Sequence, residues 1–221
     1  MAQLPDPCRW HLPDPAGAEP GVDVLAVGAD MDVATVFAAY ATGLFPMHLA
    51  SGELAWWSPD PRGVLPLTEL RVSRSLRRSM RAFEFTVDAE FQAVMEGCRE
   101  GRDDGAWITD DFIATYTGLH ELGWAHSVEV WREGELVGGL YGVEIGGLFA
   151  GESMFHRVTD ASKAALVTLV ERLRSCGGPR LLDVQWRTDH LATLGVVEIP
   201  RADYLERLTT ALDLPPCLGE E

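Results

Sequence analysis

The sequence predicts an α/β (α+β) fold, in which a small N-terminal domain precedes a larger domain built on a mixed, mainly antiparallel sheet. Length is the first observation, because 221 residues suffice for one large core or for a small domain joined to a larger one. The second is a run of three strand-like segments between residues 126 and 155, separated by turns that contain glycine. The third is a helical segment at 160–175 that leads into another strand at 180–185.

The first 65 residues are expected to form the small domain. Residues 1–20 contain five prolines, which block regular structure. Val22 to Val27 are expected to form a short strand, and Asp32 to cap a helix that Gly43 terminates. Prolines at both ends of the segment 61–66 mark a boundary, so the predicted domains are 1–65 and 66–221.

Two adjacent tryptophans, Trp56 and Trp57, run into a turn that Pro59 and Pro61 bracket and Arg62 ends. Neighbouring side chains on a strand point to opposite faces, so one indole needs a partner outside the local core. For this segment alone we favour two rings that pack on the prolines and seal a small core. The alternative is a binding role, because an indole at a turn is a platform for a flat ligand such as an adenine ring.

The charge balance is strongly acidic except in one segment. The net charge is −16, which by itself disfavours a nucleic-acid partner. Five arginines nevertheless lie within eleven residues without an intervening acid, at positions Arg71, Arg74, Arg77, Arg78 and Arg81. Read as a helix, the last four fall at i, i+3, i+4 and i+7 and share one face. A solvated helix face is the simpler alternative, but the absence of local acids favours a polyanion partner.

Cysteine spacing and hydropathy exclude several classes of protein. Cys8, Cys98, Cys176 and Cys217 are far apart and form no CxxC or Cys/His pair, so we expect thiols and neither a zinc site nor a disulfide. No apolar run approaches the roughly 20 residues that cross a bilayer, and the N-terminus lacks the layout of a signal peptide. A cytoplasmic protein is therefore expected.

Beyond residue 65 the apolar pattern predicts alternating helices and strands. Helices are expected near 73–82, 88–99, 110–122, 160–175, 188–194 and 201–212, and strands near 83–87, 126–131, 135–144, 147–155 and 180–185. The central strands form a predicted antiparallel meander. Meander, helix and strand is the order of the acyltransferase core known as the GNAT fold. Residues 155–160 lack the glycine-containing turn that cradles a coenzyme A pyrophosphate, which disfavours that ligand.

Acidic side chains interrupt two otherwise apolar strands. In the strand 181–185, a two-residue period places Asp183 and Gln185 on one face and Leu182 and Val184 on the other. An ionised aspartate on a buried strand requires a cation or a dense hydrogen-bond network. Glu152 interrupts the strand that ends at Phe155 in the same way. Each acid alone is as compatible with a structural network as with catalysis, but together they predict a pocket that is part anionic and part apolar.

Eight blocks of sequence, in order along nearly the whole chain, resemble the bacterial leucyl/phenylalanyl-tRNA-protein transferases. They are Leu25–Asp30, Ala39-Tyr40 with Gly43–Pro46, Trp56–Arg62, Trp107–Thr109, His126–Trp131, Gly151–Phe155, Leu182–Gln185, and Leu194-Gly195 with Glu198–Arg201. Met47-His48 depart from the pattern, because the family often has a tryptophan after the Phe-Pro pair. Gly28-Ala29-Asp30 replaces the more usual Gly-Gly-Asp.

The resemblance implies a small N-terminal domain joined to a GNAT-like domain. It implies transfer of Leu, Phe or less readily Met from aminoacyl-tRNA to proteins that begin with Arg or Lys, which creates a degradation signal for the ClpS and ClpAP system. We expect a monomer with no cofactor and no metal.

The implied catalytic residues are Asp183, Gln185 and Glu152. The donor ester is already activated, so the protein mainly positions the reactants. We expect Asp183 to attract the substrate ammonium and accept its proton, Gln185 to hold the geometry or polarise the ester, and Glu152 to bind the cation or support this network. Substrate assistance by the tRNA 2′-hydroxyl is an open alternative to a carboxylate base.

Matching positions and apolar character also predict the binding residues. The expected side-chain pocket consists of Leu140, Met154, Phe155, Leu166, Leu169, Leu173 and Leu182. Trp56, Trp57 and Trp107 are expected to stack on the terminal adenosine or to shape its site, and the Arg71 to Arg81 segment to hold acceptor-stem phosphates. An acetyl-CoA-dependent N-acetyltransferase and a non-catalytic RNA-binding module are the two rival interpretations.

Overall fold

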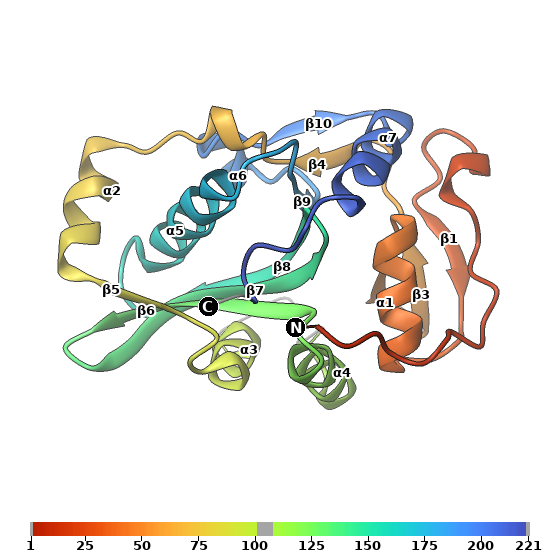
Figure 1. Ribbon diagram of the computed structural model, residues 1–221, viewed down its shortest axis with the longest axis horizontal. Helices are drawn as coiled ribbons and strands as arrows, with labels where there is room; N and C mark the ends of the chain where they lie inside the picture. The colour runs from red at the N-terminus through yellow and green to blue at the C-terminus, as the bar shows by residue number, and fades with distance from the viewer. Residues whose placement is uncertain (1, 101–107, 220–221) are drawn as a thin grey trace.

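The computed structural model describes residues 2–100 and 108–219, which form two β-sheets with helices around them (Figure 1). A three-stranded sheet has the order β1-β3-β2, and a seven-stranded sheet has the order β10-β4-β9-β8-β7-β6-β5. The mixed α+β class predicted from the sequence is thus confirmed. None of the helices in the described part of the chain is long and apolar enough to cross a membrane.

The elements have the following bounds. The strands are β1 (Val24–Val27), β2 (Phe45–His48), β3 (Leu54–Trp57), β4 (Arg62–Val64), β5 (Glu84–Val87), β6 (Ala125–Arg132), β7 (Glu135–Ile145), β8 (Leu148–His156), β9 (Leu181–Gln185) and β10 (Val197–Ile199). The helices are α1 (Val33–Thr42), α2 (Arg74–Ser79), α3 (Phe91–Arg99), α4 (Asp110–Glu121), α5 (Ala161–Ser175), α6 (Asp189–Thr193) and α7 (Arg201–Leu212).

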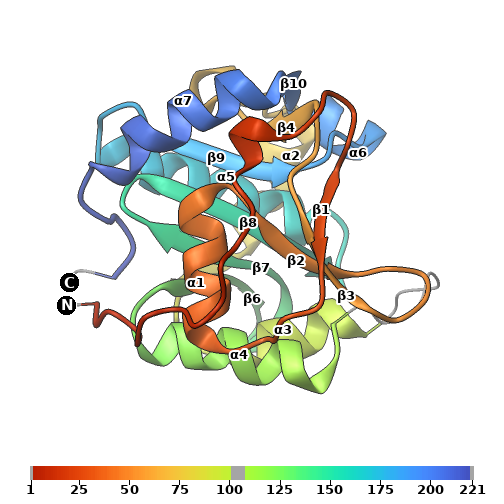
Figure 2. The same ribbon diagram turned by 90° about the vertical axis from the view of Figure 1, so that its right-hand side faces the viewer.

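The N-terminal helix begins and ends where the sequence predicts. The Asp32 side chain accepts a hydrogen bond from the backbone N–H of Ala34, and Gly43 ends α1 in the left-handed conformation. The chain then returns as the antiparallel pair β2 and β3, and β1 pairs with the other edge of β3. These elements lie at the right-hand end of the molecule in Figure 1, and Figure 2 shows them facing the viewer.

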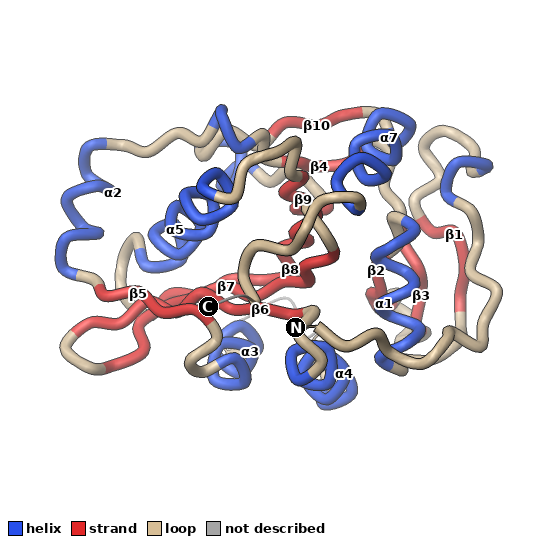
Figure 3. Tube along the Cα trace, viewed as in Figure 1, coloured by secondary structure: helices blue, strands red, loops and turns tan. Residues whose placement is uncertain are grey.

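The seven-stranded sheet contains the predicted meander. Strands β6, β7 and β8 pair antiparallel, and β9 returns parallel to β8 after α5. Helix α5 covers one face of the sheet, and α3 and α4 lie on the other, as the blue and red segments of Figure 3 show. The predicted order of meander, helix and strand is therefore confirmed, and β8 is contacted by α5 from one face and by α3 from the other.

Strand β4 brings the N-terminal part of the chain into the large sheet. It lies between β9 and β10 in the large sheet and pairs antiparallel with both. It precedes the predicted domain boundary, which stays a prediction, because the described contacts do not by themselves divide the chain into folding units. The sequence analysis did not identify β2, β4 or β10, which are only three or four residues long.

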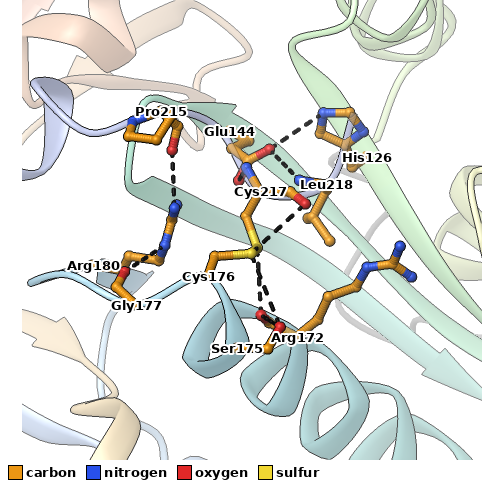
Figure 4. The surroundings of a disulfide bond; sticks show 10 residues. All are labelled: His126, Glu144, Arg172, Ser175, Cys176, Gly177, Arg180, Pro215, Cys217 and Leu218. Carbon is orange, nitrogen blue, oxygen red and sulfur yellow. Dashed lines mark hydrogen bonds and ion pairs between the residues drawn. A yellow bond between two sulfur atoms is a disulfide. The ribbon is translucent and has the colours of Figure 1, made fainter. Parts of the chain in front are cut away.

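The C-terminal residues 215–218 are bound to α5, to β7 and to the loop that follows α5 (Figure 4). Cys217 forms a disulfide with Cys176 at the end of α5, so the expectation of four free thiols was wrong for these two. The buried Glu144 carboxylate accepts the backbone N–H groups of Cys217 (2.7 Å) and Leu218 (2.9 Å). Arg180 also donates to the Pro215 carbonyl. The partners are 41 residues apart, and only tertiary structure brings them together.

The first prediction concerns this disulfide. A cross-link restricts the unfolded chain, so Cys217→Ser is expected to lower the free energy of unfolding by about 2–4 kcal/mol and the melting temperature by about 4–16 °C. Wild type and variant are compared by thermal unfolding with and without dithiothreitol, and the difference should vanish when reductant is present. Titration of the denatured, unreduced wild type should find two thiols, Cys8 and Cys98. Four thiols, or equal melting without reductant, would contradict the cross-link.

Candidate active site

A cavity of about 470 Å³ lies between the small sheet, α5, α6 and the strands β7, β8 and β9. Its wall is mostly apolar, with Glu152, Ser153, Gln185, Thr188 and His190 as polar exceptions. The lining residues are Phe45, Pro46, Met47, Leu140, Gly151, Glu152, Ser153, Met154, Leu166, Leu169, Leu182, Val184, Gln185, Trp186, Thr188, His190 and Leu191. A concave apolar site with a few convergent polar groups is the usual form of a binding site for a small molecule or side chain.

The cavity gathers most of the apolar residues named from the sequence. Leu140, Met154, Leu166, Leu169 and Leu182 all line it. Phe155 points the other way, because β8 alternates its side chains, and its ring lies against Gly97 of α3. Leu173 is buried in the core one turn beyond the part of α5 that reaches the cavity. The geometry thus supports five of the seven predicted pocket residues.

Two of the three predicted tryptophans, Trp56 and Trp57, do not line the cavity. Trp56 is 1% exposed, and its indole N–H donates to the Gly28 carbonyl. Trp57 donates to the Met47 carbonyl and packs edge-on against Trp186, which lines the cavity. Trp56 is thus a core residue and Trp57 supports the cavity wall, but neither lines the cavity. Trp186 is one of the cavity residues that the sequence analysis missed. Trp107 lies outside the described residues.

Glu152 is the acid that reaches the cavity. It projects from β8, where Tyr116 Oη donates to its Oε2 (3.1 Å) and Gln185 Nε2 donates to its Oε1 (3.0 Å). Tyr116 in turn shares a hydrogen bond of 2.5 Å with Tyr40. Burial raises the pKa of Glu152 to about 7; the two tyrosines oppose this shift and the nearby Asp183 adds to it. A carboxyl group with this pKa changes protonation state near neutral pH, which suits proton transfer.

Asp183 lies away from the cavity and has a cation as its partner. Arg62 Nε donates to Oδ1 (2.9 Å) and an Nη donates to Oδ2 (2.6 Å), in a bidentate pair with both side chains at most 1% exposed. Tyr204 Oη also donates to Oδ2 (3.0 Å), and the Gln185 backbone N–H donates to Oδ1 (2.9 Å). The sequence analysis required a cation or a dense hydrogen-bond network here, and it identified neither Arg62 nor Tyr204. These four bonds occupy the carboxylate, so its predicted contact with a substrate ammonium is not supported.

Gln185 breaks the alternation of β9. Its φ is +58°, and the Trp186 N–H donates to the Val184 carbonyl across it (2.7 Å). The side chain therefore turns to the face of Leu182 and Val184 and lines the cavity, while Asp183 faces Arg62. The prediction that Asp183 and Gln185 share a face was wrong, because a two-residue period holds only while the backbone stays extended.

The predicted arginine cluster forms a second hollow on the surface. Arg74, Arg77 and Arg78 lie on α2, and Arg81 lies in the following turn Met80–Ala82. These four side chains line a hollow of about 320 Å³, and Arg71 is exposed just before the helix. No ion pair between these arginines and an acid is present within residues 2–100 and 108–219. An uncompensated group of guanidinium ions is suited to bind phosphates.

An apolar cavity with a few polar groups and a separate group of arginines suit a group transferase with an anionic donor. The apolar cavity ends at a carboxyl group and an amide, and the arginine hollow lies on the helix next to α5 (Figure 1). The family described as leucyl/phenylalanyl-tRNA protein transferase matches residues 64–209, and its N-terminal domain matches residues 29–60. The chain belongs to this family and is an aminoacyltransferase.

Relatives over nearly the full length agree. The leucyl/phenylalanyl-tRNA-protein transferase of Pseudoalteromonas atlantica is 48% identical over 93% of this chain and 89% of its own. That of Stutzerimonas stutzeri is 52% identical over 95% and 91%. Among solved structures, a GCN5-related N-acetyltransferase-like protein of Streptococcus suis matches with 14% identity and a TM-score of 0.36, over 63% of this chain and 57% of its own.

The second prediction uses the pKa of Glu152. An ionised Glu152 accepts a proton, so the transfer rate should fall as pH drops through about 7. In Glu152→Gln only an already neutral α-amino group reacts, so the maximal rate should be lower and the midpoint should move to about 7.7–8.0, the ordinary pKa of that group. Single-turnover rates between pH 5.5 and 9 measure this, with the exposed Glu206→Gln as control. An unchanged midpoint in Glu152→Gln would contradict a role in proton transfer.

The third prediction concerns the arginine hollow. Arg74→Glu combined with Arg78→Glu should weaken tRNA binding and reduce the slope of log affinity against log salt by about two. Binding is measured by filter retention or fluorescence anisotropy between 50 and 300 mM salt. Two single variants, Arg78→Glu and Arg207→Glu, separate a local effect from an effect of net charge. Both change the net charge equally, but Arg207 lies on α7, away from the hollow. Equal losses from both would argue against a specific phosphate site.

Proposed function

We propose that the protein transfers Leu or Phe, and less readily Met, from aminoacyl-tRNA to the α-amino group of proteins that begin with Arg or Lys. The new N-terminal residue then acts as a degradation signal. One observation carries the proposal: the apolar cavity ends at a carboxyl group with a pKa of about 7 and an amide that contact each other. Family membership supports the same reaction class.

The apolar part of the cavity is suited to the donor side chain. Leu140, Leu166, Leu169 and Met154 offer no hydrogen-bond partner except the weakly accepting sulfur, so polar side chains would lose their water without compensation. One methylene changes binding by only about 1–3 kcal/mol, so several apolar residues that are not branched at Cβ are accepted with graded efficiency. Met154 is flexible enough to adapt to different side chains.

The reaction is aminolysis of an ester. The amine nitrogen attacks the carbonyl carbon, the bond from that carbon to the ribose oxygen breaks, and the amide forms. The substrate ammonium gives up two protons, of which one passes to the Glu152 carboxylate and one leaves with the released ribose hydroxyl. Gln185 uses one N–H on Glu152, and its second N–H is available to the ester oxygen, where negative charge develops. Asp183 contributes by fixing Gln185.

The acceptor should be cationic. Glu152 attracts the α-ammonium at the end of the cavity, and the net charge of −16 favours the approach of a basic N-terminal residue. The same charge repels RNA everywhere except at the arginine hollow, which limits tRNA to one orientation. Charged tRNA and new N-termini are both found in the cytoplasm, where we propose that the protein acts as a monomer.

The fourth prediction tests the proposed function. Purified protein should transfer radiolabelled leucine or phenylalanine from charged tRNA to a protein that begins with Arg or Lys, and less than a tenth as well to the same protein beginning with Asp. Acid-precipitable label measures the transfer. Leu169→Trp, which fills the cavity, should abolish it. Turnover of acetyl-CoA without tRNA would instead identify the rival N-acetyltransferase, and tRNA binding without transfer would identify an RNA-binding module.

A further inference from the structure

The conformation of Gln185 is unusual for a residue with a side chain. Its φ of +58° lies in the left-handed region, and the hydrogen bond from Trp186 to Val184 closes a three-residue turn around it. This type of turn is rare and strained, and strained residues persist only where the surroundings hold them. In this chain the strained conformation points the Gln185 amide into the cavity. The groups that stabilise the turn therefore determine where this amide lies during the reaction.

The Asp183 carboxylate holds the turn from the opposite face of the strand. Its Oδ1 accepts the backbone N–H of Gln185 at 2.9 Å, two residues along the chain. This bond fixes the peptide group just before the left-handed residue, as aspartate side chains do in turns. A rotation of the carboxylate would release it, so the orientation of Asp183 controls the turn.

Arg62 determines that orientation. Its two bonds to Asp183 are parallel, and its guanidinium lies 4.8 Å from the ring centre of Phe45 and 4.4 Å from that of Tyr204. A third nitrogen donates to the Gly43 carbonyl (3.3 Å). A planar fork held between two rings leaves the carboxylate one orientation. The arginine comes from β4 and therefore from a different part of the chain than β9.

The next residue on β4 permits the close approach. Gly63 pairs with Gln185, and a Cβ at this position would lie 2.6 Å from the backbone carbonyl carbon of Trp186. The register between β4 and β9 shifts between Gly63 and Val64, so β9 carries one extra residue at this point. The dipeptide Arg62-Gly63 thus shapes the turn through both its side chain and its backbone.

We infer that Arg62 is a positioning residue for aminoacyl transfer, which acts through Asp183 to hold Gln185 in the turn that directs its amide to Glu152 and the donor ester. The inference rests on the role proposed above for Gln185. Tyr204 assists, because its hydroxyl donates to the same carboxylate and its ring covers the guanidinium.

The experiment compares Arg62→Lys with Arg201→Lys. Lysine keeps the charge of Arg62 but cannot form two parallel bonds, so kcat should fall about 10- to 100-fold while KM for charged tRNA stays within about twofold. Arg201 is also buried and lies outside this network, so Arg201→Lys should keep the kcat of the wild type. A folded Arg62→Lys with wild-type kcat would overturn the inference.

A double-mutant cycle separates positioning from a general structural effect. If Arg62 acts through Gln185, then Arg62→Lys should slow the wild type but cause no further loss in Gln185→Ala. A structural effect would instead slow both backgrounds equally and would overturn the inference. Where Gln185→Ala itself retains wild-type kcat, the proposed role of Gln185 fails, and this inference fails with it.

The pH profile provides a second readout. The charged or titratable groups that face Glu152 are Tyr40 from α1, Tyr116 from α4, Asp183 from β9 and Arg62 from β4. Arg62→Lys preserves the charge, so the midpoint near pH 7 should stay while kcat falls; a shifted midpoint would overturn a purely geometric role.

If Arg62→Lys does not fold, Tyr204→Phe decides, because it removes one bond to Asp183 and keeps the ring. A threefold or larger fall in kcat supports the inference, and an unchanged kcat overturns it.

Discussion

The buried ion pair between Arg62 and Asp183 is the constraint on which the site depends. Both side chains are almost fully removed from water, and all the hydrogen-bonding positions of the carboxylate are used. The cost of removing two charges from water offsets most of their attraction, so such a pair contributes little net stability. Breaking it is costly, however, because one charge would remain buried alone. The ion pair therefore fixes the orientation of the Asp183 carboxylate, and this carboxylate in turn holds the backbone N–H of Gln185.

The N-terminal part of the chain completes the active site rather than standing beside it. Phe45 and Met47 of β2 line the cavity, and Tyr40 of α1 continues the hydrogen-bond chain that begins at Glu152 and Tyr116. Strand β4 lies between the edge strand β10 and β9, and it places Arg62 beside Asp183 of β9. Glu152, Gln185 and Asp183 thus each have a hydrogen-bond partner from a distant segment, which suits a reaction limited by positioning.

Local sequence patterns predicted most elements but few of their partnerships. The caps of α1, the meander and the helix before β9 all follow from neighbouring residues, and the structure confirms them. Strands of three or four residues carry too little periodicity to be recognised, and β4 was missed for that reason. The Cys176–Cys217 disulfide was missed because spacing along the chain says nothing about two cysteines that separate elements bring together.

The sequence by itself determined the fold class, the order of the longer elements, the family and the acids on β8 and β9, because each depends on short-range periodicity or on motifs read in order. It also implied that Asp183 has a cation or a dense hydrogen-bond network as its partner, since a buried charge requires one or the other. Only the tertiary structure decided that the partner is Arg62, 121 residues away, and that the carboxyl group in the cavity is Glu152. The reason is physical: burial, pairing and the turn at Gln185 are set by contacts between segments that no local pattern encodes.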